Sequence, residues 1–255
     1  MSNTTSAFLQ NVGYRRRAWV VFAIATVAAI VASSPWWWPA RLRSDHAAEA
    51  RARVAPELDA RLRALGSSLG SPVFIRIFKQ PPVLELWVRS GQRFALFKQY
   101  PICRVSGTLG PKTSEGDQQA PEGLYTVGLA QLNPKSRFYL AMNLGYPNLV
   151  EAARGWTGSA LMVHGGCVSI GCYAMGDDAI AEIYTAVSEA LHSGQGTVPV
   201  HAFPFPLDAA NLERHSRAPS YSYWQELASA YQAFERTHVP PRVELTQQGY
   251  DVSSP

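Results

Sequence analysis

One short segment, residues 164–172, contains the residue types from which a cysteine-nucleophile site could be built. It reads His-Gly-Gly-Cys-Val-Ser-Ile-Gly-Cys, so His164 and Cys172 lie eight positions apart with three glycines between them. A thiolate is a strong nucleophile, and a histidine within hydrogen-bonding reach can accept the proton of a thiol. The glycines exclude a helical face but allow a loop that returns on itself. The segment predicts that Cys172 attacks and His164 is the base.

Two other residues of this segment have predicted roles. Gly171 allows a sharp turn before Cys172, so that the amides of Gly171 and Cys172 could face a developing oxyanion. Ser169 could orient the imidazole or bind substrate. Taken singly, a histidine before glycines or a buried cysteine is more often structural than catalytic. Their combination on one short segment favours catalysis.

Composition and the N-terminal sequence limit where such a site could operate. The chain has 255 residues, of which 47% are hydrophobic and 16% are charged, which predicts one main catalytic domain. Its formal net charge is +4, with much of the positive charge in the first quarter. No patch of interleaved basic and aromatic residues occurs around the predicted site, so a nucleic-acid partner is not expected.

An apolar run near the N-terminus predicts export. Residues 18–32 are apolar, three arginines precede them at positions 15–17, and three tryptophans follow at positions 36–38. A helix of about 21 residues, from 18 to 38, would be about 32 Å long and could cross a bilayer. We expect a cytoplasmic N-terminus at 1–17, an inner-membrane anchor at 18–38 and a periplasmic catalytic domain. A cleaved signal peptide, which would release the domain into the periplasm, is the alternative, and a buried core helix is less favoured.

The number of cysteines suits an oxidising compartment, where thiols pair and an odd one remains. If Cys172 is the nucleophile, Cys103 and Cys167 are the candidates for a disulfide that would attach a strand to the active-site loop. Alternatively, both are small buried residues with inert thiols. A zinc site is less favoured, because His164 and the two nearby cysteines could supply at most three ligands. No metal or cofactor is expected.

The elements that position the site are predicted from hydrophobic periodicity and turn residues. Helices are expected at 177–191 and 223–237. Strands are expected at 73–78, 83–88, 93–100, 123–127, 138–142, 160–163 and 197–203. Pro199 restricts the last strand to an edge or a bulge. The pattern predicts a mainly β fold with flanking helices, of the α+β class.

Segments outside these elements suggest the domain boundaries. An amphipathic helix at 45–65, broken at Pro56, is expected within a helical linker at 39–70. The catalytic domain is expected at 71–244, with a long polar loop at 107–123. Residues 245–255 are expected to be a flexible tail.

The active-site segment resembles the signature of the L,D-transpeptidase (YkuD-type) catalytic domain, a His-Gly pair followed by Ser-x-Gly-Cys. Residues 173–175 read Tyr-Ala-Met, where most members of that family carry an arginine. This ending is similar to the YafK-like branch, as are the motifs at 100–103, 110–112, 115–117 and 143–148. The resemblance spans about residues 73–243. It implies a β-sandwich or mixed-sheet catalytic domain.

The resemblance also implies an activity in cell-wall remodelling. Cys172 would attack a carbonyl beside diaminopimelate in a peptidoglycan stem peptide and form a thioester, with His164 as base and then acid. An amine acceptor would complete a transpeptidation. Water would make the chain a hydrolase (amidase), which in the YafK-like branch implies release of a lipoprotein from peptidoglycan. A membrane-tethered peptidoglycan-binding module without turnover is an alternative of another class.

Contacts with substrate are predicted less directly. The candidates for a groove that holds the sugar–peptide polymer are Gly165, Tyr173, Tyr146, Lys112 and Trp156. Tyr146 and Trp156 could instead pack on the sheet. Asp117 and Glu122 lie on the polar loop and border the cleft in one interpretation, whereas in the other they are merely solvated. The residue that replaces the family arginine could be Arg104, Lys112 or Arg154.

Overall fold

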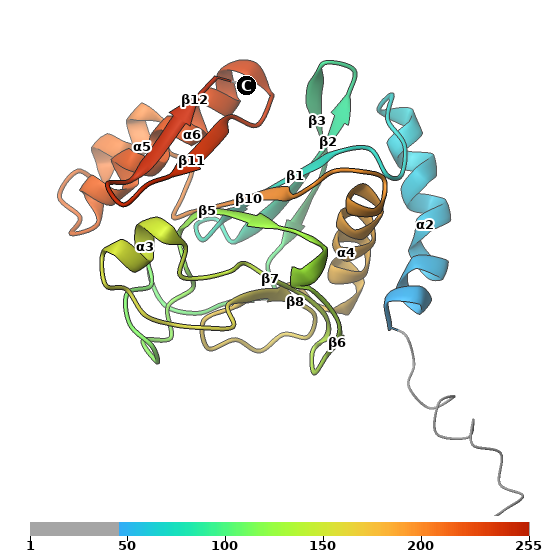
Figure 1. The fold of residues 1–255 in the computed structure, drawn as a ribbon, viewed down its shortest axis with the longest axis horizontal. Helices are drawn as coiled ribbons and strands as arrows, with labels where there is room; N and C mark the ends of the chain where they lie inside the picture. The colour runs from blue at the N-terminus through green and yellow to red at the C-terminus, as the bar shows by residue number, and fades with distance from the viewer. Residues whose placement is uncertain (1–45, 255) are drawn as a thin grey trace, which may run out of the picture. The chain divides into compact units, whose positions relative to one another are not determined.

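The computed structural model describes residues 46–254. They form an α+β fold in which helices pack against two five-stranded sheets (Figure 1). No helix within residues 46–254 is long and apolar enough to cross a membrane. The predicted cytoplasmic segment at 1–17 and the predicted anchor at 18–38 lie outside the described residues.

The first sheet has the strand order β3-β2-β1-β10-β5. Its strands are β1 (Val73–Phe78), β2 (Val83–Ser90), β3 (Arg93–Pro101), β5 (Gly123–Val127) and β10 (Val198–Phe203). All five were predicted from their apolar patterns. The pair β1 and β10 is parallel and the other pairs are antiparallel. Every residue of β1 is buried, as expected for a central strand covered on both faces.

Strand β10 lies inside this sheet, so the edge position predicted from Pro199 is wrong. The ladder with β1 begins at Ile75 and Val200, after the proline. Before that point, the side chain of Gln195 replaces a strand partner, because its amide accepts from Val73 N at 2.9 Å and donates to Val73 O at 2.9 Å. The missing amide hydrogen of Pro199 therefore leaves no gap in the β1 ladder.

The second sheet carries the candidate site and has the order β4-β9-β8-β7-β6. Its strands are β4 (Arg104–Val105), β6 (Leu132–Ser136), β7 (Tyr139–Asn143), β8 (Met162–His164) and β9 (Tyr173–Ala174). Strands β8 and β9 are parallel. Strands β4, β6 and β9 were not predicted, because β4 and β9 have two residues each and the β6 sequence, Leu-Asn-Pro-Lys-Ser, has no run of apolar residues. The short helix η2 (Leu129–Gln131) precedes β6.

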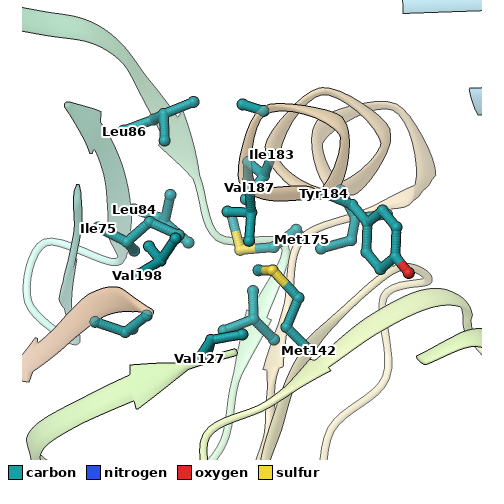
Figure 2. Close-up of a cluster of buried hydrophobic side chains, with 14 of the residues drawn as sticks. Ile75, Leu84, Leu86, Val127, Met142, Met175, Ile183, Tyr184, Val187 and Val198 are labelled. Carbon is teal, nitrogen blue, oxygen red and sulfur yellow. The ribbon is translucent and has the colours of Figure 1, made fainter. Parts of the chain in front are cut away.

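Helix α4 (Asp177–His192) covers the core that the two sheets share. Figure 2 shows Ile183 and Val187 of this helix facing Leu84 and Leu86 of β2, with Met142 of β7 nearby. The first turn contains two aspartates, which suit the positive end of the helix dipole. The α4 prediction is confirmed, and its C-terminal end is one residue later than expected.

Helix α2 (His46–Ala64) is continuous through Pro56, so the predicted break is wrong. Pro56 lies on the exposed face of the helix. A proline removes one intrahelical hydrogen bond, and on this face the freed carbonyl can bond to water instead.

The same helix is part of the folded unit rather than a linker. Leu58 and Leu62 are buried in the main core. On the surface, Arg51 pairs with Glu189 at 2.6 Å and thereby joins α2 to α4. Figure 1 shows α2 running alongside α4.

Residues near the C-terminus form a β-hairpin, so a flexible tail is not what the structure shows. Strand β11 (Arg242–Leu245) pairs with β12 (Tyr250–Ser253), beside helix α6 (Tyr221–Thr237) (Figure 1). The hydroxyl of Tyr250 lies 3.1 Å from that of Tyr223 and accepts from Asn148 Nδ2 at 3.0 Å. Asn148 caps helix α3 (Leu149–Ala153), and helix α5 (Ala209–Arg214) precedes α6. These hydrogen bonds attach the hairpin to the domain.

Candidate active site

His164 is the last residue of β8 and is 2% exposed. Its Nδ1 lies 2.5 Å from Gly165 O, and since a carbonyl can only accept, Nδ1 carries the hydrogen. Nε2 therefore presents a lone pair. The ring stacks on Phe138, with centroids 4.7 Å apart and planes 26° apart, which fixes its orientation. The imidazole is held in the tautomer that a general base needs.

Cys172 directly precedes β9 and is a free, half-buried thiol. In the parallel β8–β9 pair, Val163 is opposite Tyr173 and His164 is opposite Ala174. Extending this register by one residue places Cys172 beside Met162, on the same side as His164, because side chains alternate along a strand. The thiol donates to Ala160 O at 3.7 Å. Within residues 46–254 no hydrogen bond joins Cys172 to His164, and such bonds often form only when substrate binds.

Ser169 organises the turn before the cysteine. Its hydroxyl donates to Cys172 O at 2.7 Å and accepts from Cys172 N at 2.9 Å and Gly171 N at 3.2 Å. The two amides that were expected to form an oxyanion hole are therefore bonded to Ser169 in this resting structure. Ser169 is also 3.2 Å from Ser106 Oγ, which links the turn to the residue after β4. These bonds give Ser169 a structural role in the turn, and its predicted part in orienting the imidazole or binding substrate stays a prediction.

Two glycines of the segment are required by their surroundings. A Cβ at Gly165 would lie 2.6 Å from Asp177 Oδ1 and 2.7 Å from the carbonyl oxygen of Phe138, closer than side chains tolerate. Gly171 has a φ of +145° and packs against Leu161. A side chain at either position would shift the loop that carries the thiol. Gly165 thus has a packing role, and its predicted contact with substrate stays a prediction.

Burial favours the neutral form of both central groups. It lowers the pKa of His164, although the hydrogen bond to Gly165 opposes this shift. Burial raises the pKa of the Cys172 thiol, and the nearby backbone of Met162 opposes that shift. Both shifts favour a neutral thiol and a neutral imidazole at rest, forms in which an imidazole can accept the proton of a thiol that attacks.

A disulfide joins Cys103 to Cys167, with Cα atoms 5.4 Å apart. This is the pair expected from the cysteine count, and Cys172 is the free thiol. Cys103 directly precedes β4, and Cys167 lies within the active-site loop. The disulfide therefore attaches the loop to the edge strand of the second sheet.

Comparison with known proteins decides the family. The chain is 46% identical over 187 residues to the Escherichia coli protein YafK, whose name places it among the L,D-transpeptidases, and the match covers 73% of this chain and 76% of the relative. The chain belongs to the YafK-like L,D-transpeptidase family. A second Escherichia coli strain has a YafK protein with the same identity and coverage. No family model matches the chain.

Two solved structures show more distant similarity. A variant of the helical cell shape determining protein Pgp2 from Campylobacter jejuni is 20% identical, with a TM-score of 0.44, and the match covers 75% of this chain and 63% of that one. Bd1075 from Bdellovibrio bacteriovorus is 17% identical, with a TM-score of 0.36, and the match covers 69% of this chain and 75% of that one.

In this member of the YafK-like family, three predicted substrate contacts are buried. Tyr173 is completely buried, and its hydroxyl donates to Pro121 O at 2.6 Å. Tyr146 is 6% exposed and donates to Lys112 O at 2.8 Å. Lys112 is 3% exposed and pairs with Asp117 at 2.6 Å. Neither tyrosine lines an open groove as predicted, and Lys112 holds the polar loop together.

The other polar-loop candidates also have structural partners. Glu122 is completely buried and pairs with Lys79 at 3.0 Å, so it cannot border a cleft as one interpretation had it. Burial raises the pKa of Asp117, but hydrogen bonds from Lys112 and three backbone amides outweigh burial and lower that pKa to about 2. Trp156 is half-buried against Tyr223, with ring centroids 5.2 Å apart. Trp156 therefore packs against a side chain of helix α6, whereas the alternative drawn from the sequence was packing on the sheet.

The sequence did not predict a role at the site for Phe138 or Ser106, or for two exposed apolar residues of the loop, Val168 and Ile170. Val168 is 59% exposed and Ile170 is 83% exposed, on either side of Ser169. A weak signal existed for these two residues, since valine and isoleucine are unusual in a glycine-rich polar loop. Phe138 and Ser106 gave no signal, because only the fold brings them to the site. Within residues 46–254 no three His, Cys, Asp or Glu side chains cluster as metal ligands would.

Proposed function

We propose that this chain remodels peptidoglycan through an acyl intermediate on Cys172. The acyl donor is a stem peptide that contains diaminopimelate, and an amine is the acceptor. The observation that carries the proposal is a free thiol directly before β9, next to the parallel strand β8 that ends at a histidine whose Nε2 is left as a base, in a YafK-like chain.

The proposed reaction has two halves. Nε2 of His164 takes the thiol proton while the Cys172 sulfur bonds to the donor carbonyl carbon. The carbon–nitrogen bond of the donor then breaks, and the leaving amine receives the proton from His164, which leaves a thioester. The acceptor amine attacks this thioester, His164 accepts its proton and returns it to the sulfur, and the carbon–sulfur bond breaks.

Charge on the tetrahedral oxygen needs donors that are free to face it. The amides of Gly171 and Cys172 suit this role, but both are bonded to Ser169 at rest. The proposed mechanism therefore requires the Ser169 hydroxyl to release them when the donor is bound. A hydrogen-bond donor of this kind typically contributes about 3 kcal/mol to a transition state.

Hydrolysis of the same thioester is a second candidate. It is favoured by the open surroundings of the thiol, since Cys172 is only half-buried and Ile170 beside it is 83% exposed. Water could then replace the amine and make the chain an amidase that releases a lipoprotein from peptidoglycan. In either form we propose a periplasmic site, tethered to the inner membrane by residues 18–38.

The test is incubation of the full-length chain with purified sacculi, followed by mass spectrometry of the muropeptides. Cross-linked or amino-acid-exchanged products indicate transfer, whereas shortened stems or loss of a bound lipoprotein remnant indicates hydrolysis. We expect Cys172→Ala to abolish both types of product and Val168→Ala, on the same loop, to preserve them. Full turnover by Cys172→Ala, or wall binding with no turnover by the wild type, would refute the enzyme and favour the binding module.

A further inference from the structure

The structure separates the three basic residues that could replace the family arginine. Lys112 is buried and pairs with Asp117. Arg154 pairs with Glu226 at 2.5 Å and lies over the Trp156 ring. Arg104 is exposed, and within residues 46–254 its side chain forms no ion pair or hydrogen bond. Arg104 is therefore the one of the three whose charge is available to a ligand.

The register of the second sheet places Arg104 on the face of the catalytic pair. Arg104 is opposite Ala174 in the antiparallel β4–β9 pair, and Ala174 is opposite His164 in the parallel β8–β9 pair. Residues opposite each other across strands point to the same face. Adjacent strands are about 4.8 Å apart, so Arg104 begins two strand spacings from His164. A long, flexible arginine side chain can cover that gap from one side of the thiol.

Strand β4 is firmly attached to the loop that carries the nucleophile. The Cys103–Cys167 disulfide lies directly before Arg104, and the contact of 3.2 Å between Ser106 and Ser169 lies two residues after it. Arg104 thus stands between two links to the active-site turn. Its backbone position relative to Cys172 is fixed, while its guanidinium is free.

We propose that Arg104 binds a carboxylate of the acyl donor, the one on the diaminopimelate beside the carbonyl that Cys172 attacks. This inference rests on the proposed function. A guanidinium presents two parallel N–H donors that match the two oxygens of a carboxylate. The pairing would orient the donor across β9, with its carbonyl over Cys172 and its leaving amine towards His164.

A second exposed arginine provides a comparison within the same site. The Arg137 guanidinium lies 5.5 Å from the centroid of the Phe138 ring, which stacks on His164. Arg137 is thus on the opposite side of His164 from Arg104. Arg137→Ala therefore tests whether any positive charge near His164 can bind the donor carboxylate, or only the charge of Arg104 on β4.

The experiment measures binding of a synthetic tetrapeptide, L-Ala-γ-D-Glu-diaminopimelate-D-Ala, to the full-length Cys172→Ala chain by calorimetry. A second peptide carries an amide in place of the diaminopimelate side-chain carboxylate. We expect Arg104→Ala to weaken binding of the carboxylate peptide about 10- to 100-fold and to leave the amidated peptide unchanged. Arg104→Lys should bind the carboxylate peptide with an intermediate affinity, because lysine keeps the positive charge but lacks the two parallel N–H donors of the guanidinium.

Arg93→Ala is the matched control, since Arg93 is an exposed arginine on β3 of the other sheet. We expect it to leave both affinities unchanged. Equal loss of affinity for both peptides, no loss in Arg104→Ala, or a loss that appears only in Arg137→Ala would overturn the assignment. Turnover of sacculi by the wild type reports separately on the proposed function. If sacculi are turned over but Arg104→Ala does not distinguish the two peptides, the role of Arg104 is refuted and the enzyme is not. If Arg104→Ala distinguishes the two peptides but sacculi are not turned over, the enzymatic function is refuted and the carboxylate site is not.

Discussion

At the scale of single residues, the site depends on how His164 is held. The hydrogen bond from Nδ1 to Gly165 O and the stacking on Phe138 leave Nε2 as the acceptor. Burial lowers the pKa of His164 and raises the pKa of Cys172, which favours the neutral imidazole and the thiol. In the proposed mechanism, proton transfer therefore belongs to the attack step, unlike in enzymes that hold a preformed thiolate–imidazolium pair.

This assignment predicts the pH dependence of Cys172 acylation. The rate should rise with pH with a midpoint below the ordinary imidazole value of about 6.5, because only neutral His164 accepts the proton and its pKa is lowered. In His164→Gln, the acylation rate should no longer rise with pH around this midpoint, and it should be about 10²- to 10⁴-fold lower than in wild type. The measurement is single-turnover thioester formation across about pH 4.5–8.

Alkylation of Cys172 by iodoacetamide supplies the control for that profile. Its rate follows the thiolate, so its midpoint should lie above the ordinary thiol value. If the acylation rate rises with pH in the same way in wild type and in His164→Gln, another group is the base.

At the scale of elements, the active-site turn depends on its links to β4. The disulfide closes a separation of 64 residues, from Cys103 to Cys167. A closed loop of this length restricts the unfolded chain and stabilises the folded one by about 4 kcal/mol in the chain-entropy model. The same link fixes the strand that carries Arg104.

We therefore expect the double variant Cys103→Ser/Cys167→Ser to lose about 2–5 kcal/mol of unfolding free energy in a denaturant titration. The double change avoids leaving a second free thiol beside Cys172. Wild type measured with a reducing agent should match the variant. If wild type and variant have equal stability under oxidising conditions, the disulfide does not stabilise the fold.

At the scale of the whole molecule, the N-terminal helix of the described region is part of the same folded unit as the candidate site. Leu58 and Leu62 of α2 are buried against the shared core, and Arg51 pairs with Glu189 of α4. Helix α4 in turn contacts β1, β7 and β8, and β8 ends at His164. Loss of α2 would thus expose the side of the core that supports the site.

Leu62→Ala should lower the free energy of unfolding by about 2–5 kcal/mol, because it leaves a cavity in that core. Glu57→Ala on the exposed face of the same helix is the control and should change it by less than about 0.5 kcal/mol. Thermal unfolding monitored by circular dichroism measures both. Equal stability of Leu62→Ala and wild type would mean that α2 is a linker after all.

Strands with alternating or continuous apolar runs were predictable, since β1 and β5 are defined by their own side chains. Strands β4 and β9 were not, because each has two residues and exists only through its neighbours. The burial of Tyr173 follows from its register opposite Val163, which no local pattern encodes. The Pro56 and Pro199 predictions failed for related reasons, because Pro56 lies on an exposed helix face where a freed carbonyl can reach water, and near Pro199 the Gln195 amide donates to Val73 O.

The sequence by itself determined the family, through 46% identity to YafK over 187 residues, and it supplied the residue types on which the proposed chemistry depends, His164, Ser169, Gly171 and Cys172. Tertiary structure alone decided which of the basic and aromatic residues are available to a substrate. Tyr146 and Lys112 were candidates for contact with substrate and are buried, whereas Arg104 is exposed on the strand next to β9. The physical reason is that exposure and pairing depend on contacts between distant segments, whereas reactivity begins with the residue itself.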